Sequence, residues 1–363
     1  MNKYLIGKEV SKHVLMAGNY YKHHHPGGIS AVVQYWAEYI DGIQYYPTYR
    51  LSNVVVRMWW FLTSYVRMAV RLCFDKDVKI VHLHSAADGS FWRKAQIVRL
   101  AKMFGVKVVF HVHASRFKDF YNEASESKKA WIRSVLTKSD MVIALSQSWK
   151  EWFAGIGVED DKIVVLHNIT SYPVVRESDR VNDGKTHFLF MGEIGKRKGV
   201  FDLIDVLARH REEFEGRLEL RIGGNRCEEQ LKRAIADGGL ENMVKFEGWV
   251  GGDKKIALLN WTDVFVLPSY NEGLPISILE AMSYGRPVVS TTVGGIPEVV
   301  STDKNGVLIA PGDKDALYGA IKKYVDNPSV IGQEGAVSKD VAREYLPDYV
   351  LGHLKCIYQN LLA

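Results

Sequence analysis

Two glutamates eight residues apart are the side chains whose type and spacing most clearly permit chemistry. Glu272 lies in a glycine- and proline-containing turn after an apolar run, and Glu280 lies in the helical pattern that begins at Pro275. A helix N-terminus presents unpaired N–H groups and a partial positive charge, which together attract anions. A diphosphate would therefore lie well over Gly273 and Leu274. The two carboxylates could then accept hydrogen bonds from the hydroxyl groups of a polyol on either side.

A cationic turn precedes another expected helix. Lys196, Arg197 and Lys198 follow one another in MGEIGKRKGVFDLIDVLARH (191–210), which has the pattern of a strand end, a glycine turn and a helix start. The helix macrodipole disfavours positive charge at this end unless an anion is present. The turn therefore indicates an anionic ligand, and a solvated basic loop is the alternative interpretation.

Two segments of the N-terminal half carry further candidates. Gly27 and Gly28, between the first expected strand and helix, leave room for a phosphate or sugar to approach the backbone, although a Gly-Gly pair alone is also compatible with a simple turn. His113 ends the apolar run VKVVFHVH (106–113). His111 faces the same way one repeat deeper, so we expect a hydrogen-bonded core histidine there.

The segment 268–298 resembles family 4 of the retaining glycosyltransferases. The Glu-x7-Glu signature of that family matches Glu272 and Glu280, and its Gly-x-Pro-Val strand and Gly-Gly-x-x-Glu turn match residues 285–288 and 294–298. The cationic turn and the Gly-Gly loop are also similar to family segments. The resemblance implies an α/β protein of GT-B architecture, with two Rossmann-like parallel-sheet domains facing a central cleft. The acceptor would lie mainly on the N-terminal domain and the donor mainly on the C-terminal domain.

The same resemblance implies roles for individual residues. His113 and Glu272 are the expected catalytic residues, because they would face the reacting sugar and hold its hydroxyl groups. The expected donor-binding residues are Gly27, Gly28, Arg197, Lys198, Asn271, Gly273, Leu274 and Glu280. One position departs from the family pattern: many relatives have an arginine where this chain has Glu193. Either Arg197 replaces that arginine or the diphosphate meets one cation fewer.

We expect no metal and no cofactor. The Asp-x-Asp match at 75–77 precedes a strand instead of following one, and the match at 313–315 has the pattern of a helix N-cap. The three consecutive histidines 23–25 cannot all point at one ion. A helix N-terminus together with Lys198 and Arg197 could neutralise a leaving diphosphate as Mg²⁺ would.

Short β-branched runs alternate with segments of helical length, which indicates βαβ units and parallel sheets buried on both faces. We expect an acceptor-side domain over residues 1–170, a polar linker over 171–185 and a nucleotide-sugar domain over 186–346. A last helix over 347–363 could pack on either domain, including back on the first.

Composition narrows the class of protein. The chain has 363 residues, 47% of them apolar, and three well-separated cysteines without metal-ligand spacing, which fits a reducing cytoplasm. Residues 1–170 carry 23 Lys and Arg against 14 Asp and Glu, whereas the remainder is acidic. A nucleic-acid motif does not occur among these basic residues, so we expect no nucleic-acid partner.

Residues 49–74 have the pattern of a basic amphipathic helix. Arg50, Arg57, Arg67 and Arg71 share one side, opposite an apolar side that includes Trp59. Such a helix is typical of attachment to an anionic membrane surface, here the inner face of the membrane. A domain helix that buries its apolar side in the core is the alternative.

The sequence thus predicts a retaining hexosyltransferase that moves a sugar from a UDP-, GDP- or ADP-sugar to a saccharide acceptor, lipid-linked in our interpretation, in surface polysaccharide synthesis. A nucleotide-sugar epimerase on the same fold and a catalytically silent sugar-nucleotide-binding protein remain alternatives. A dehydrogenase is disfavoured, because Gly192, Gly195 and Gly199 lack the required G-x-G-x-x-G spacing. The base, the sugar, the acceptor, the linkage and the oligomeric state are not specified.

Overall fold

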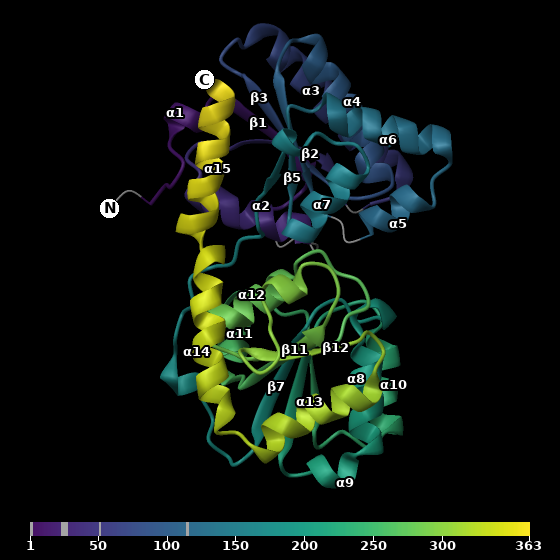
Figure 1. Ribbon diagram of the computed structural model, residues 1–363, viewed down its shortest axis with the longest axis vertical. Helices are drawn as coiled ribbons and strands as arrows, with labels where there is room; N and C mark the ends of the chain where they lie inside the picture. The colour runs from purple at the N-terminus through teal and green to yellow at the C-terminus, as the bar shows by residue number, and fades with distance from the viewer. Residues whose placement is uncertain (1–2, 23–27, 51, 114–115) are drawn as a thin grey trace. The chain divides into compact units, whose positions relative to one another are not determined.

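The computed structural model describes residues 3–22, 28–50, 52–113 and 116–363. The chain forms two compact units, Met1–Ile169 with Pro347–Ala363, and Thr170–Leu346. We call them the N-terminal unit and the C-terminal unit (Figure 1). Each contains one six-stranded parallel sheet, which confirms the predicted α/β class with two parallel-sheet domains.

The sheet of the N-terminal unit has the strand order β2-β1-β3-β4-β5-β6. Its strands are β1 Val14–Asn19, β2 Gln44–Tyr49, β3 Ile80–Ser85, β4 Lys107–Val112, β5 Met141–Ala144 and β6 Ile163–Val165. Its helices are α1 Lys8–Ser11, α2 Gly28–Tyr39, α3 Val54–Phe74, α4 Gly89–Met103, α5 Phe117–Asn122, α6 Glu126–Lys138, α7 Gln147–Gly155, η1 Asp160–Lys162 and α15 Pro347–Leu362.

Both faces of this sheet are covered. Apolar side chains of β1, β3, β4 and β5 pack with α3, α4, α6 and α7 in one core. On the opposite face, Trp36 of α2 and Tyr358 of α15 contact histidines of β3 and β4. The C-terminal helix α15, drawn in yellow, therefore belongs to the N-terminal unit and lies beside α1 (Figure 1).

The sheet of the C-terminal unit has the order β12-β11-β10-β7-β8-β9. Its strands are β7 Thr186–Met191, β8 Leu218–Gly223, β9 Val244–Gly248, β10 Val264–Leu267, β11 Val288–Thr291 and β12 Gly306–Ile309. Its helices are η2 Glu177–Asp179, η3 Lys196–Lys198, α8 Val200–Arg209, α9 Arg211–Phe214, α10 Glu228–Asp237, α11 Gly252–Trp261, α12 Ile276–Ser283, η4 Ile296–Glu298, α13 Lys314–Asp326, α14 Val330–Ala342 and η5 Arg343–Tyr345.

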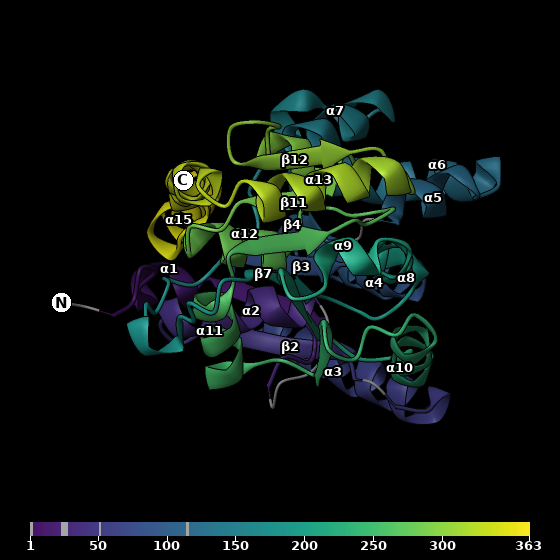
Figure 2. The same cartoon turned by 90° about the horizontal axis from the view of Figure 1, so that it is seen from below.

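Helices also pack along this second sheet. α13 contacts α8 and the strands β11 and β12, and α12 contacts β10 and β11 (Figure 2). The central strands are fully buried, so the sequence shows them as near-continuous apolar runs. As predicted, Asp313 caps a helix, because its side chain accepts a hydrogen bond from the Ala316 N–H at 2.9 Å.

Candidate active site

The strand order of the C-terminal unit fixes where a ligand can bind. The chain runs from β7 to β8 and β9, then returns to place β10 on the other side of β7. In such sheets the loops after the two strands diverge and leave a crevice at their carboxyl ends. Here the loop after β7 carries the cationic turn 196–198, and the loop after β10 carries residues 268–275. The Tyr270 N–H donates to the Arg197 carbonyl at 2.8 Å, which joins the two loops.

An ion pair connects the two loops at their side chains. The Lys198 Nζ lies 2.5 Å from Oε1 of Glu272, and both side chains are largely buried. The Ser269 hydroxyl donates to the same oxygen at 2.8 Å. Arg197 Nη1 lies 3.8 Å from it and donates to the Asn271 carbonyl at 3.0 Å. The structure therefore brings four of the expected site residues together, Arg197, Lys198, Asn271 and Glu272, and adds Ser269.

Two glycines allow the backbone of this region to pack closely. Gly199 has φ 69°, and a Cβ there would lie 1.9 Å from the Pro268 carbonyl oxygen. Gly294 has φ 59°, and a Cβ there would lie 2.1 Å from the Glu272 carbonyl oxygen. Only glycine accepts both the left-handed conformation and the contact. The backbone at Gly199 and the backbone at Gly294 therefore pack against the Glu272 turn from two sides.

The helix that follows the turn keeps its N-terminus uncapped by a side chain. The sequence predicted Pro275 as the first residue of the helix. In the structure Pro275 is the N-cap and the helix begins one residue later, at Ile276, and the described residues provide no side-chain cap. Gly273 and Leu274 precede it and are buried. Because no side chain among the described residues caps α12, its first N–H groups can serve as donors for an anion.

The second glutamate of the motif is buried inside α12. Glu280 Oε1 lies 2.5 Å from the Lys255 Nζ of α11. The sequence predicts Glu280 as a donor-binding residue and does not identify Lys255 as its partner. The ion pair orients the carboxylate, and both functions of the carboxylate, ion pairing and hydroxyl binding, can coexist because it has two oxygens.

The departure at Glu193 has a structural counterpart. Glu193 Oε2 lies 3.4 Å from Nε of Arg226 and 4.0 Å from Nη2 of Arg197. Arg226 follows β8 with φ 92°, a conformation that non-glycine residues rarely adopt, and it is largely exposed. An arginine thus lies at this edge of the sheet from a different strand. The only sequence signal for it was the short GGNRC loop at the end of β8.

His113 directly follows β4 and is part of a histidine cluster. Its ring Nε2 lies 3.0 Å from the Nδ1 of His84 on β3, and its backbone N–H donates to the Ser85 carbonyl. One layer deeper, His82 Nε2 lies 3.3 Å from His111 Nδ1, and the Tyr358 hydroxyl lies 2.6 Å from His82 Nδ1. His111 is therefore a hydrogen-bonded core residue, as predicted.

Burial keeps these four imidazoles neutral. It lowers the pKa of His82 and of His113 to about 3, and the pKa values of His84 and His111 lie well below the ordinary 6.5. Nitrogens of His82, His84 and His111 lie within 4.8 Å of one another, a spacing that could hold a metal ion. The positive charge of Lys94 contributes to lowering the pKa of His84, and a metal cation bound to these histidines would place a second positive charge close to it. We therefore interpret the group as a hydrogen-bonded cluster.

The glycine-rich loop is only partly described. Gly27 lies outside the described residues, as do histidines 23–25. Gly28 is exposed at the start of α2, and a Cβ there would meet no atom within 4 Å. Close packing within the described chain therefore does not explain a glycine at position 28.

The apolar side of α3 faces outward. The exposed fractions of Val55, Trp59 and Leu62 are 75%, 66% and 53%, whereas Met68 and Leu72 are buried against the sheet. The structure therefore contradicts the alternative interpretation, in which the apolar side of α3 is buried in the core. Among the described residues, none of the helices is long and apolar enough to span a membrane.

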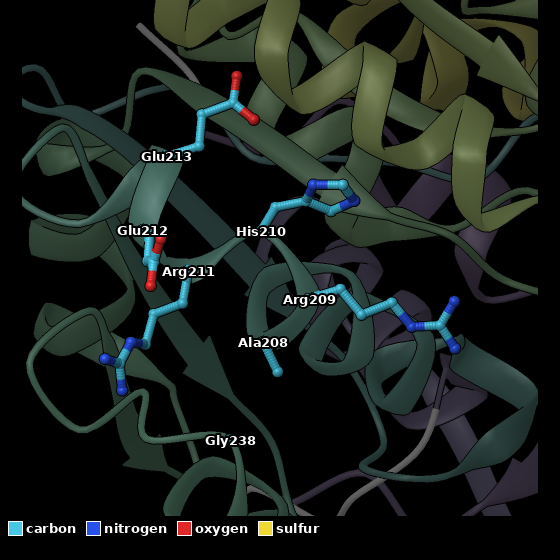
Figure 3. A pocket seen from close by; sticks show the side chains of 7 residues that line it. All are labelled: Ala208, Arg209, His210, Arg211, Glu212, Glu213 and Gly238. Atoms are coloured by element: carbon cyan, nitrogen blue, oxygen red, sulfur yellow. The ribbon is translucent and has the colours of Figure 1, made fainter.

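A hollow of about 410 Å³ lies elsewhere in the C-terminal unit (Figure 3). It is lined by Ala208, Arg209, His210, Arg211, Glu212, Glu213 and Gly238. These residues come from the end of α8, from α9 and from the end of α10, which lead into β8 and β9, so they lie at the amino edge of the strands, opposite the loops described above. Glu213 is held there by Lys322 and Tyr318. The hollow therefore does not belong to the candidate site.

Two parallel sheets, with the cationic turn and the Glu272 turn at a strand-order reversal, are the arrangement expected of a GT-B glycosyltransferase. The sequence profile described as "Glycosyl transferases group 1" matches residues 172–337, and that described as "Glycosyltransferase Family 4" matches residues 26–170. The chain belongs to glycosyltransferase family 4.

Individual relatives agree with this assignment. An uncharacterized glycosyltransferase of Methanocaldococcus jannaschii is 25% identical over 80% of this chain and 77% of its own length. The amylovoran biosynthesis glycosyltransferase AmsK of Erwinia amylovora is 29% identical over 67% of this chain and 60% of its own length. The O-antigen chain mannosyltransferase C of Escherichia coli is 26% identical over 70% and 67%, respectively.

Solved structures agree in fold. A glycosyltransferase from Rickettsia africae superposes with a TM-score of 0.73 at 17% identity, over 100% of this chain and 99% of that chain. Alr3699/HepE of Anabaena, in complex with UDP-glucose, superposes with a TM-score of 0.72 at 17% identity, over 96% and 99%. The predicted GT-B fold is therefore confirmed.

Proposed function

We propose that this glycosyltransferase transfers a sugar, with retention of anomeric configuration, from a nucleotide-diphosphate sugar to a saccharide acceptor in surface polysaccharide synthesis. The observation that carries the proposal is the meeting of Lys198 and Arg197 with the Glu272 turn, which leads into α12, at the carboxyl ends of β7 and β10. Such a site concentrates positive charge where a diphosphate would leave. The names of relatives that act in amylovoran and O-antigen synthesis support the polysaccharide context.

The donor is a UDP-, GDP- or ADP-sugar in this proposal, and UDP-glucose is the first to test because Alr3699/HepE was solved with it. Lys198 and Arg197 would bind the diphosphate together with the first N–H groups of α12. Glu272, held by Lys198 and Ser269, has a second carboxylate oxygen for the sugar hydroxyls. Glu280, oriented by Lys255, would hold the ribose.

The transfer exchanges one bond for another. The bond between the anomeric carbon and the diphosphate oxygen breaks, and its electron pair leaves with the diphosphate. The acceptor hydroxyl oxygen bonds to the same face of that carbon, and its proton passes to the departing phosphate oxygen. Lys198 and Arg197 stabilise the negative charge that develops, so no metal ion is required in this mechanism. His113, neutral at pH 7, can exchange a hydrogen bond with the sugar without adding charge.

The acceptor in this proposal is linked to a lipid, and α3 attaches the protein to the inner face of the membrane. The exposed apolar side of α3 supports this part, since an unpartnered apolar helix face that carries tryptophan is typical of interfacial helices. Arg50 lies over the rings of Tyr20 and Trp60, Arg67 lies over Tyr46, and both arginines are exposed at the surface.

One experiment separates the proposal from its alternatives. Purified protein is incubated with each nucleotide sugar and a lipid extract of its source organism, and both the released nucleotide diphosphate and the glycolipid are quantified. A transferase yields equal amounts of both products. An epimerase yields an isomeric nucleotide sugar without net release, and a silent binding protein yields neither. Either of the last two results would overturn the proposal.

A further inference from the structure

The N-terminal unit has its own strand-order reversal, between β1 and β3. The loop after β3 leads into α4, whose first two turns carry Ser90, Arg93 and Lys94. None of these residues has a role in the transfer mechanism above. Because ligands of doubly wound sheets bind at such a point, the side chains of these two turns are the ones to examine.

Lys94 is completely buried and has only neutral partners among the described residues. Its Nζ donates to the Thr48 hydroxyl at 2.7 Å and lies 3.4 Å from the Ser90 hydroxyl. The Thr48 hydroxyl in turn donates to the Gly18 carbonyl at 3.0 Å, so it can accept from the amine. Burial, and next the charge of Arg93, lower the pKa of Lys94 well below its usual 10.5. A buried lysine is rare without a counter-charge.

Arg93 adds a second cation without an ion pair to any described residue. Its Nε is buried and has no hydrogen-bond partner in the described parts of the chain, and its guanidinium carbon lies 5.2 Å from the centre of the Tyr49 ring. A Cβ at Gly89 would lie 3.4 Å from Arg93 Nη1, so the guanidinium folds back over the first residue of α4. The nearby charge of Arg57 also lowers the pKa of Arg93, after burial.

The N-terminus of α4 adds a partial positive charge to these two cations. Asp88, at the N-cap with φ 54°, forms no side-chain cap, so its carboxylate does not satisfy the first N–H groups of the 15-residue helix. A helix N-terminus favours anions and disfavours cations. Arg93 and Lys94 belong to the second turn, but their charged ends reach back to Gly89 and Ser90 of the first turn, where the field of the helix opposes them. An anion bound between them would stabilise both side chains and the helix N-terminus.

We infer that Arg93, Lys94 and the first turn of α4 form a phosphate-binding subsite, which holds the phosphate or diphosphate of the acceptor. The inference rests on the proposed function, and it specifies the acceptor as one that carries a phosphate. The subsite adjoins the histidine cluster: Lys94 contacts Thr48, Thr48 donates to the Gly18 carbonyl, and a Cβ at Gly18 would lie 3.0 Å from the Cβ of His84, which contacts His113. A phosphate bound there lies at the same sheet edge as the residue proposed to face the sugar.

Hydrogen–deuterium exchange with inorganic pyrophosphate tests the subsite. We expect pyrophosphate to slow amide exchange in two separate segments, residues 86–94 of the N-terminal unit and residues 193–199 of the C-terminal unit. Arg93→Gln should raise the pyrophosphate concentration needed to protect the first segment at least tenfold and should leave protection of the second segment unchanged. Lys94→Met should act in the same way. The matched control Arg99→Gln removes an exposed charge from the same helix, and it should change neither segment.

The outcomes distinguish this inference from the proposed function. Protection of 193–199 alone in the unmodified protein, or protection of 86–94 that persists in Arg93→Gln, overturns the subsite and leaves the donor site intact. Protection of 86–94 alone supports the subsite and contradicts the donor site. Loss of protection at 193–199 in Lys94→Met would show misfolding, and Arg93→Gln then decides.

The source of the phosphate is tested with vesicles. Phosphatidylglycerol and phosphatidylcholine vesicles are compared in the same exchange experiment. If the acceptor supplies the phosphate, anionic vesicles protect α3 but not 86–94, and pyrophosphate still protects 86–94 in their presence. If a lipid headgroup occupies the subsite, phosphatidylglycerol protects 86–94 and competes with pyrophosphate. The second result would overturn the assignment to the acceptor.

Discussion

The ion pair between Lys198 and Glu272 allows catalysis and stability to be separated by mutation. Lys198→Met removes the amine that lies 2.5 Å from a carboxylate with 7% exposure. Breaking a buried pair costs about 3–5 kcal/mol when a charge is left without partners. Here Ser269 still donates to Glu272 and Arg197 remains 3.8 Å away, so we expect a loss of about 1–3 kcal/mol in the free energy of unfolding. Urea denaturation measures it.

The effect on transfer should be larger and of different origin. Removing one donor that stabilises the leaving charge costs about 10²–10³ in kcat, or roughly 2.7–4 kcal/mol. We therefore expect Lys198→Met to lower kcat/KM by at least a hundredfold while the protein stays folded. Lys196→Met is the matched control, because Lys196 is exposed in the same turn, and its variant should retain activity within about twofold.

The double variant decides between the two roles. In Lys198→Met/Glu272→Gln the unpaired charge is gone, so most of the lost stability should return. Activity should not return, because both donor contacts are missing. Recovery of activity together with stability, or a single Lys198→Met variant with near-normal kcat/KM, would refute the assignment of Lys198 to the diphosphate.

Three further predictions follow from other parts of the structure. The histidines of the cluster are neutral when folded, with pKa values of about 3 for His82 and His113 against 6.5 when unfolded, so their contribution to stability is present above pH 6.5 and is lost as the pH falls. Each should cost about 1.4 kcal/mol per pH unit below 6.5, and circular dichroism should show acid unfolding of the N-terminal unit that His82→Gln makes less steep. Transfer should continue in EDTA, and activity that disappears with EDTA and returns with Mg²⁺ or Mn²⁺ would contradict the metal-free mechanism. Trp59→Ser should reduce sedimentation with anionic vesicles severalfold, whereas Trp249→Ser, at a residue with 53% exposure in the C-terminal unit, should not; vesicle binding insensitive to Trp59 would sink the role of α3.

The sequence predicts the buried central strands because both of their faces are apolar. It is less informative at the sheet edges. β2 contains Pro47 and half-buried polar residues, and β9 has one fully buried residue, so neither forms a continuous apolar run. Neither strand therefore gives the β-branched apolar signal that predicts strands from sequence, although the alternation of strands and helices indicated the fold class.

The loops of the candidate site were predictable, and their partners were not. Gly199 and Gly294 accept positive φ values in tight contacts, which is why the turns leave a recognisable pattern in the sequence. Lys255 and Arg226 reach the site from α11 and from the loop after β8, and a single long cation gives no local signal of what it pairs with. The same holds for Lys94, whose burial follows only from the packing of α4 on β3 and β4.

The orientation of the α3 apolar side also required the structure. Periodicity defines an amphipathic helix, and it cannot tell whether the apolar stripe faces a core or the surface. In α3 the buried residues include Ser64, Met68 and Leu72, and the tryptophan-bearing stripe lies outside.

The most direct test of the account is the stereochemistry of the transfer product. Protein is incubated with α-configured nucleotide sugars and a lipid extract of the source organism, and the anomeric coupling constant of the new linkage is measured by NMR on the purified product. The account predicts an α-linked sugar, one nucleotide diphosphate released per linkage, and loss of both in Lys198→Met. A β-linked product, or equal product from Lys198→Met, would contradict it.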